Sequence, residues 1–154
     1  MSEIERLLIE HACARLQTQY CIHADACDVE AFTALFAEDG SVKVPEHPAF
    51  VGHAAIRASM QALAATGVVM RHIAANSLIE VRSENEAQGL CYLVAYGSTA
   101  PADANGWRPM EDPGTIGHYE DVFCRTPQGW RFKSRVLTRV LRKLDDPVLK
   151  AARS

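Results

Sequence analysis

The chain has 154 residues, of which 48% are hydrophobic and 23% charged, and its formal net charge is −3. Such a composition favours one globular domain that buries its own core. With 16 Lys and Arg against 19 Asp and Glu, the charge balance argues against a nucleic-acid-binding protein.

The cysteines and the N-terminus indicate where the protein works. Five cysteines without a C-x-x-C pair argue against a disulfide framework and for a reducing compartment. The first residues lack the basic start and apolar run of a signal peptide, and no apolar stretch approaches the ~20 residues that span a bilayer. We therefore expect a cytoplasmic protein without a membrane partner.

The first half of the chain has helical spacing. Ser2 and Glu5 form a capping box, and we expect a helix from there to about Asp25. Its apolar positions recur every three or four residues: Ile4, Leu7, Leu8, Ala12, Leu16 and Tyr20. Asp28 can cap a second helix, and residues 53–66 form a third. Between them we expect a short strand at 41–44 and a loop at 46–52.

The second half has the spacing of extended chain. We expect strands at 72–81, 87–99, 116–125 and 130–141, the last two joined as a hairpin. Residues 100–114, rich in Pro, Gly and Asp, form a loop and a candidate lid. This order predicts one α+β domain at residues 1–142, with a meandering antiparallel sheet, helices on one face, and a charged tail at 143–154.

Asp25 and His72 are the first candidates for chemistry. Asp25 is a carboxylate near the end of an apolar helix, where the macrodipole disfavours an anion, and His72 opens a strand. A hydrogen bond between them would leave the second imidazole nitrogen as a positioned base. A structural histidine and an exposed helix-end aspartate are the alternatives, because the spacing alone does not show that the two residues meet.

Tyr20 is either a phenol that binds a substrate oxygen or a core aromatic residue. Five residues along a straight helix place it about 140° from Asp25, so the two would have to approach one pocket from different sides. Asp121 and Arg135 lie on strands that should pair, and they form either a structural ion pair or an anion site. Arg135 alternates with Trp130 and Phe132, so we expect it on the face opposite to theirs.

Further polar groups lie on the predicted sheet. On the strand at 72–81, we expect His72, Asn76 and Glu80 to share one face. Tyr96, Tyr119 and His118 follow on later strands, and the last two point to opposite faces. We expect no metal site, because His23 and Asp25 differ by about 200° on a helix. No Gly-rich phosphate loop or dinucleotide fingerprint is present, so no cofactor is expected.

An ordered set of motifs resembles the SnoaL-like members of the NTF2-like superfamily. The resemblance extends from about Ile4 to Arg139. The residues that carry it are Tyr20, Asp25, Asp28, Leu35-Phe36, Asp39-Gly40, Phe50, Gly52, Ala55-Ile56, Arg71-His72, Asn76, Glu84-Asn85, Ala87, Gly89, Tyr119, Asp121, Gly129-Trp130-Arg131-Phe132 and Arg135. The family's fold is a conical α+β barrel in which a curved antiparallel sheet and three N-terminal helices enclose an apolar cavity.

The narrower similarity is to the branch with scytalone dehydratase, bile-acid 7α-dehydratase and hexachlorocyclohexane dehydrochlorinase. The resemblance implies a His–Asp dyad at His72 and Asp25. Tyr20 matches a Tyr of the bile-acid enzyme, and Arg135 matches an active-site Arg of the dehydrochlorinase. The second sheet His of scytalone dehydratase would fall near Gly97, and the extra Asp of the bile-acid enzyme near Ala95, so substrate identity does not transfer.

The function that follows is a cofactor-independent, dehydratase-like lyase acting on a small cyclic, mostly apolar substrate. His72, Asp25 and Tyr20 are the candidate catalytic residues. The candidate substrate-binding residues are Arg135, Tyr96, Asn76 and Tyr119. Isomerase- or cyclase-type proton transfer and a non-catalytic ligand-binding module remain as alternatives. The resemblance also implies a homodimer or homotrimer that associates through the outer sheet face.

Overall fold

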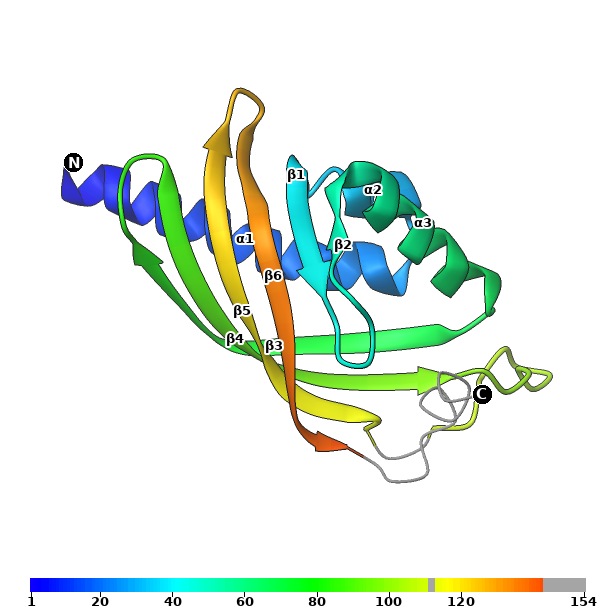
Figure 1. Ribbon diagram of the computed structural model, residues 1–154. Helices are drawn as coiled ribbons and strands as arrows, with labels where there is room; N and C mark the ends of the chain where they lie inside the picture. The colour runs from blue at the N-terminus through cyan, green and yellow to red at the C-terminus, as the bar shows by residue number, and fades with distance from the viewer. Residues whose placement is uncertain (111–112, 143–154) are drawn as a thin grey trace.

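The computed structural model describes residues 1–110 and 113–142, in which three helices lie against one six-stranded sheet (Figure 1). The helices are α1 (Glu3–Asp25), α2 (Val29–Thr33) and α3 (Gly52–Ala65). The strands are β1 (Phe36–Lys43), β2 (Phe50–Val51), β3 (Val69–Val81), β4 (Glu86–Ser98), β5 (Thr115–Thr126) and β6 (Gly129–Arg142). The predicted tail at 143–154 lies outside the described residues, as do residues 111–112 of the predicted lid.

The strand order in the sheet is β2-β1-β6-β5-β4-β3. The four strands of the second half form the predicted antiparallel meander. β1, however, pairs with β6 in parallel, because the chain passes through α3 and the whole meander before β6 returns beside it. The sheet is therefore mixed, with one parallel pair that the prediction of an antiparallel sheet did not include.

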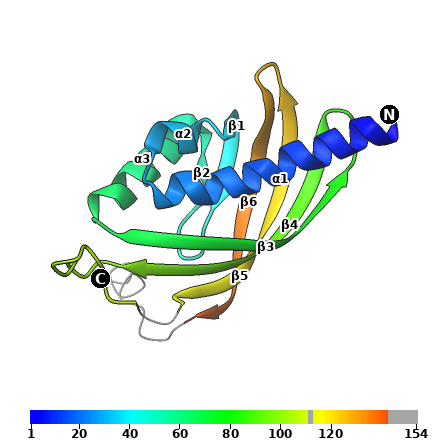
Figure 2. The same cartoon turned by 180° about the vertical axis from the view of Figure 1, so that it is seen from behind.

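Helix α1 crosses the helix-covered face of the curved sheet, which we call the inner face (Figure 2). Its start is the predicted capping box, in which the backbone N–H of Glu5 donates to Oγ of Ser2 and the backbone N–H of Ser2 donates to Glu5. The core between α1 and the sheet is aromatic, and its rings belong to Tyr20, Phe32, Phe36, Tyr119, Phe123 and Phe132. The observed architecture is the predicted α+β fold.

Three local details differ from the sequence prediction. β1 begins at Phe36 rather than at residue 41, and β2 lies in the predicted loop. Ile4, Leu7 and Leu8, placed on the apolar stripe of α1, are exposed, because the first turns of the helix extend past the sheet (Figure 1). Within residues 1–110 and 113–142, no helix is both long and apolar enough to cross a membrane.

Candidate active site

Asp25 and His72 are in direct contact where α1 ends and β3 begins. The imidazole Nδ1 of His72 lies 2.6 Å from Oδ1 of Asp25, and the backbone N–H of His72 donates to Oδ2 at 3.0 Å. Both side chains are 14% exposed. An ionised carboxylate can only accept hydrogen bonds, so Nδ1 is the donor in this contact, and in the neutral imidazole with this tautomer the lone pair is on Nε2. The two donors from β3 also support an anion that the helix C-terminus disfavours.

The end of α1 holds Asp25 in place. After Asp25 the chain turns through Ala26 and Cys27, whose φ of 51° lies in the left-handed region. The backbone N–H of Cys27 donates to the carbonyl of Ala24, and that of Asp28 donates to His23, both at 3.0 Å. This pair of bonds is a Schellman motif, which stops the helix immediately after the carboxylate.

A bulge in β3 sets which side chains face α1. Asn76 has a φ of 53°, and β3 contains one extra residue here, because residues 76 and 77 together lie opposite Cys91 alone, between the pairs Ala75–Tyr92 and Leu78–Leu90. His72 faces inward ahead of the bulge, and Ile79 and Val81 face inward after it. Glu80 therefore lies on the outer face, and the predicted alternation through the whole strand was wrong because it assumed an unbroken period of two.

Tyr20 points to different strands than Asp25 does. Its ring contacts Tyr119 of β5 and Phe132 of β6, with ring centroids 5.4 and 6.1 Å apart, whereas Asp25 contacts β3. Burial raises the pKa of Tyr20 to about 12, partly offset by the positive charge of Arg135 and a hydrogen bond with Tyr119. Because the sheet is curved, two side chains that leave α1 in directions about 140° apart can both contact its inner face.

Arg135 and Asp121 form the expected ion pair, and it is fully buried. Nε and Nη2 of Arg135 donate to the two carboxylate oxygens at 2.7 and 2.8 Å, and both side chains are 0% exposed. Burial alone would lower the pKa of the guanidinium, but the carboxylate of Asp121 holds it raised. Nη1 is buried and has no hydrogen-bond partner among the described residues.

The face assigned to Arg135 from the sequence was wrong. Val122 pairs with Ser134 and the next residue of β5, Phe123, pairs with Phe132, so β6 contains an extra residue at Lys133. This bulge brings Phe132 and Arg135 to the same inner face. The guanidinium carbon lies between 4.1 and 4.4 Å from the ring centroids of Tyr20, Tyr119 and Phe132.

The remaining predicted site residues divide between the two faces of the sheet. Tyr119 is buried in the inner cluster, and His118 faces outward, as expected from their alternation. Tyr96 is paired with Arg71, one position from the His72–Ala95 pair, so it lies on the outer face. Asn76 is exposed at the bulge. The structure therefore does not bring Tyr96 to the face that carries His72.

One buried polar residue of the inner face, Gln17, was not predicted from the sequence. Gln17 of α1 is buried, donating through Nε2 to Asp121 at 2.9 Å and accepting from the hydroxyl of Ser77 at 2.6 Å. Gly89 leaves the space for it, since a Cβ there would lie 3.1 Å from Nε2 of Gln17. A polar residue on the apolar stripe of α1 was the available signal, because a buried amide needs partners.

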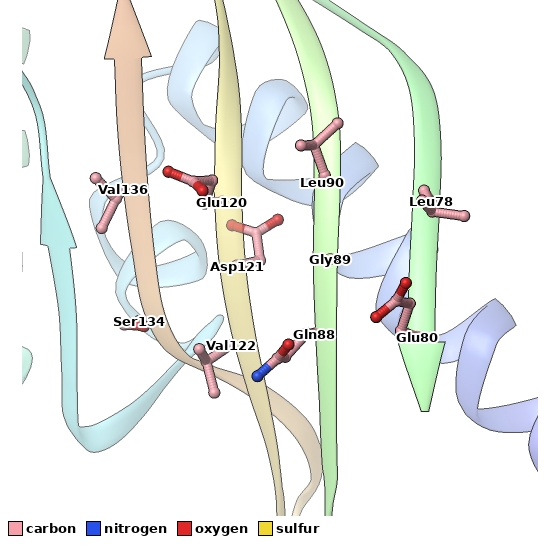
Figure 3. Close-up of a pocket in the computed structure, with 10 residues that line it drawn as sticks. All are labelled: Leu78, Glu80, Gln88, Gly89, Leu90, Glu120, Asp121, Val122, Ser134 and Val136. Carbon is pink, nitrogen blue, oxygen red and sulfur yellow. The ribbon is translucent and has the colours of Figure 1, made fainter. Parts of the chain in front are cut away.

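A hollow with a volume of about 510 Å³ lies on the outer face of the sheet (Figure 3). Its outward-facing side chains include Leu78, Leu90 and Val136, together with the carboxylates of Glu80 and Glu120. Neither Asp25 nor His72 lines it. In the part of the chain that the structure describes, no three His, Cys, Asp or Glu side chains come together as a metal-binding group.

Comparison with known proteins assigns the family. A model of the SnoaL-like domain matches residues 5–136. The chain belongs to this family. The comparison with curated proteins gave no match.

Solved structures show the same NTF2-like fold. A candidate scytalone dehydratase from Novosphingobium aromaticivorans is 23% identical with a TM-score of 0.78, over 92% of this chain and 91% of that one. An NTF2-like protein with a cystatin-like fold from the same organism is 25% identical with a TM-score of 0.70, over 98% and 92%. LinA is 15% identical with a TM-score of 0.76, over 95% and 96%. The predicted family and fold are thereby confirmed.

Proposed function

We propose that the protein is a cofactor-independent lyase that eliminates a small group from a cyclic, mostly apolar substrate. The observation that carries the proposal is the contact between His72 and Asp25. One carboxylate binds both the ring and the backbone of His72, so the position and the tautomer of the imidazole are fixed together. A base held in this way contributes on the order of 10²–10⁴-fold to proton transfer.

In the proposed reaction, Nε2 of His72 takes a proton from a carbon next to an activating group. The electron pair of that C–H bond forms the new double bond, and the bond from the neighbouring carbon to the leaving group breaks. Asp25 stabilises the imidazolium through its bond to Nδ1. The imidazolium then protonates a departing hydroxyl, so that water leaves and the base is regenerated.

We propose that Arg135 or Tyr20 holds the departing group or a carbonyl oxygen of the substrate. In favour of Arg135, Nη1 is a buried donor without a partner in the described part of the chain, and such a group calls for an explanation. Tyr20 and Tyr119 bring their phenols together on the inner face beside the same guanidinium. Tyr96 is not included, because it faces away from His72.

We further propose that the protein acts in the cytoplasm as a homo-oligomer. All five cysteines are free, which fits a reducing compartment. Apolar side chains of β3 and β4 are exposed on the outer sheet face, among them Ile73, Leu78 and Tyr92. A second copy of the chain is the occupant we propose for this apolar part of the outer face.

The test is elimination activity on a panel of hydroxylated and halogenated cyclic compounds. We expect His72→Ala and Asp25→Asn each to lower kcat/KM by at least about 10²-fold. His11→Ala is the control, because His11 is exposed on α1. Full activity in His72→Ala would refute the proposal. Retention of all substrate atoms in the product would instead indicate isomerisation, which begins with the same proton transfer.

A further inference from the structure

A second hollow lies on the outer face where β3 begins and β4 ends. Its volume is about 280 Å³, and one wall comes from the sheet at Val69, Tyr96 and Ser98. The opposite wall comes from the loop that follows β4, at Gly106, Arg108, Pro109 and Met110. Arg71 of β3 and Arg108 of the loop both line it, and we call it the Arg71–Arg108 hollow.

The two guanidinium groups keep donors available for a ligand. Arg71 donates through Nη1 to the carbonyl of Met70 at 2.6 Å, and Arg108 donates through Nη1 to the carbonyl of Ala100 at 2.7 Å. Among residues 1–110 and 113–142, neither has a carboxylate within ion-pair distance. Other arginines do have one: Arg57, Arg82, Arg135 and Arg139. A guanidinium has five N–H donors, so most of those on Arg71 and Arg108 stay open.

The loop wall is held in shape by Asp103. Its Oδ1 accepts the backbone N–H groups of Asn105 and Trp107, each at 2.9 Å. The backbone N–H of Asp103 donates to the carbonyl of Trp107 at 2.8 Å, which closes the turn. The bond from Trp107 is the main reason that the pKa of Asp103 is lowered. Arg108 therefore directly follows a hydrogen-bonded turn and does not lie in an extended segment of the loop.

We propose that the Arg71–Arg108 hollow binds a small organic carboxylate with an aromatic or branched apolar body. Guanidinium groups match a planar carboxylate with two parallel hydrogen bonds, and the apolar wall would cover the rest of such a ligand. The volume is close to the lower limit of ordinary small-molecule sites, which favours a single-ring ligand. The phenol of Tyr96 offers one more polar contact.

The hollow is separate from the His72–Asp25 pair. Arg71 and His72 are consecutive on β3 and pair with Tyr96 and Ala95, so their side chains leave opposite faces of the sheet. The proposal therefore stands or fails independently of the elimination reaction.

The experiment is a titration of the protein with benzoate, monitored both by calorimetry and by the NMR signal of the indole N–H of Trp107. Trp107 is 73% exposed beside the loop wall, whereas Trp130, the other tryptophan, is buried. We expect saturable binding, a shift of the Trp107 signal alone, and affinity at least tenfold lower for Arg71→Gln and for Arg108→Gln. Benzyl alcohol, the neutral counterpart, should bind much more weakly, and so should inorganic sulfate.

Two control variants make the result decisive. Arg82→Gln removes an exposed arginine that is paired with Glu80 beyond the other end of β3, and it should leave benzoate affinity unchanged. His72→Ala should also leave it unchanged. The proposal is overturned by absence of saturable binding, by equal affinity for benzoate and benzyl alcohol, or by loss of binding in either control variant.

Discussion

The buried pair of Asp121 and Arg135 offers the sharpest test of how the interior is built. Asp121 accepts three hydrogen bonds, two from Arg135 and one from Gln17, and the ion pair is 0% exposed. Asp121→Ala would leave the guanidinium as a buried charge without its counter-ion. It would also leave the amide of Gln17 without its acceptor on β5.

Removing one partner of a buried ion pair costs about 3–5 kcal/mol. The total free energy of unfolding of a domain is only about 5–15 kcal/mol, so the loss would be a large fraction of it. At a urea slope of about 2 kcal/mol/M, the unfolding midpoint should fall by about 2 M. Replacing both residues, Asp121→Leu with Arg135→Met, should cost less than Asp121→Ala alone, because no uncompensated charge remains.

Urea unfolding followed by circular dichroism measures both effects. Asp39→Ala is the matched control, since Asp39 pairs with Lys133 of the same strand as Arg135 but on the exposed surface. Its midpoint should stay at the wild-type value. The reasoning would be refuted if Asp121→Ala lowered the midpoint no more than Asp39→Ala, or if the double replacement were the less stable of the two.

Two other predictions concern ionisation and assembly. Because burial raises the pKa of Tyr20 to about 12 in the folded chain, the unfolded state loses this proton first, and stability should fall between about pH 10 and pH 12. Tyr20→Phe should lessen that fall and remove a late step from the tyrosinate absorbance titration; a single step near pH 10 in folded protein would contradict this. Light scattering should give two or three times the monomer mass, and Tyr92→Lys, at an exposed position of the outer face, should reduce it, whereas Lys43→Ala should not. A monomeric wild type would contradict the proposed assembly.

The order of helices and strands was predictable because it depends on the local spacing of apolar residues and on the capping and turn residues between elements. The capping box begins α1 where expected, and the four long strands appear within three residues of their predicted bounds. The parallel pairing of β1 with β6 was not predictable in this way, since it joins segments almost a hundred residues apart. Nothing in the short run around Val42 indicates which distant strand will pair with it.

The faces of the sheet were predictable only as far as the strands keep a period of two. Asp121 and Tyr119 lie where alternation places them. Arg135 does not, because Lys133 is an extra residue in β6, and a single inserted residue reverses every face assignment after it. Periodicity also does not predict the contact between Asp25 and His72, since this contact depends on how α1 crosses the sheet.

The bulge at Asn76 connects the structural and the proposed catalytic parts of the inner face. Residues 72 and 77 are five apart, so in a regular strand their side chains would leave opposite faces. With the bulge between them, His72 reaches Asp25 and Ser77 reaches Gln17, two contacts made by the same helix. Their helix partners are eight residues apart, about 12 Å along the axis. A slip of α1 by one turn would break both contacts, so the Gln17–Ser77 bond holds the register on which the geometry of His72 and Asp25 depends.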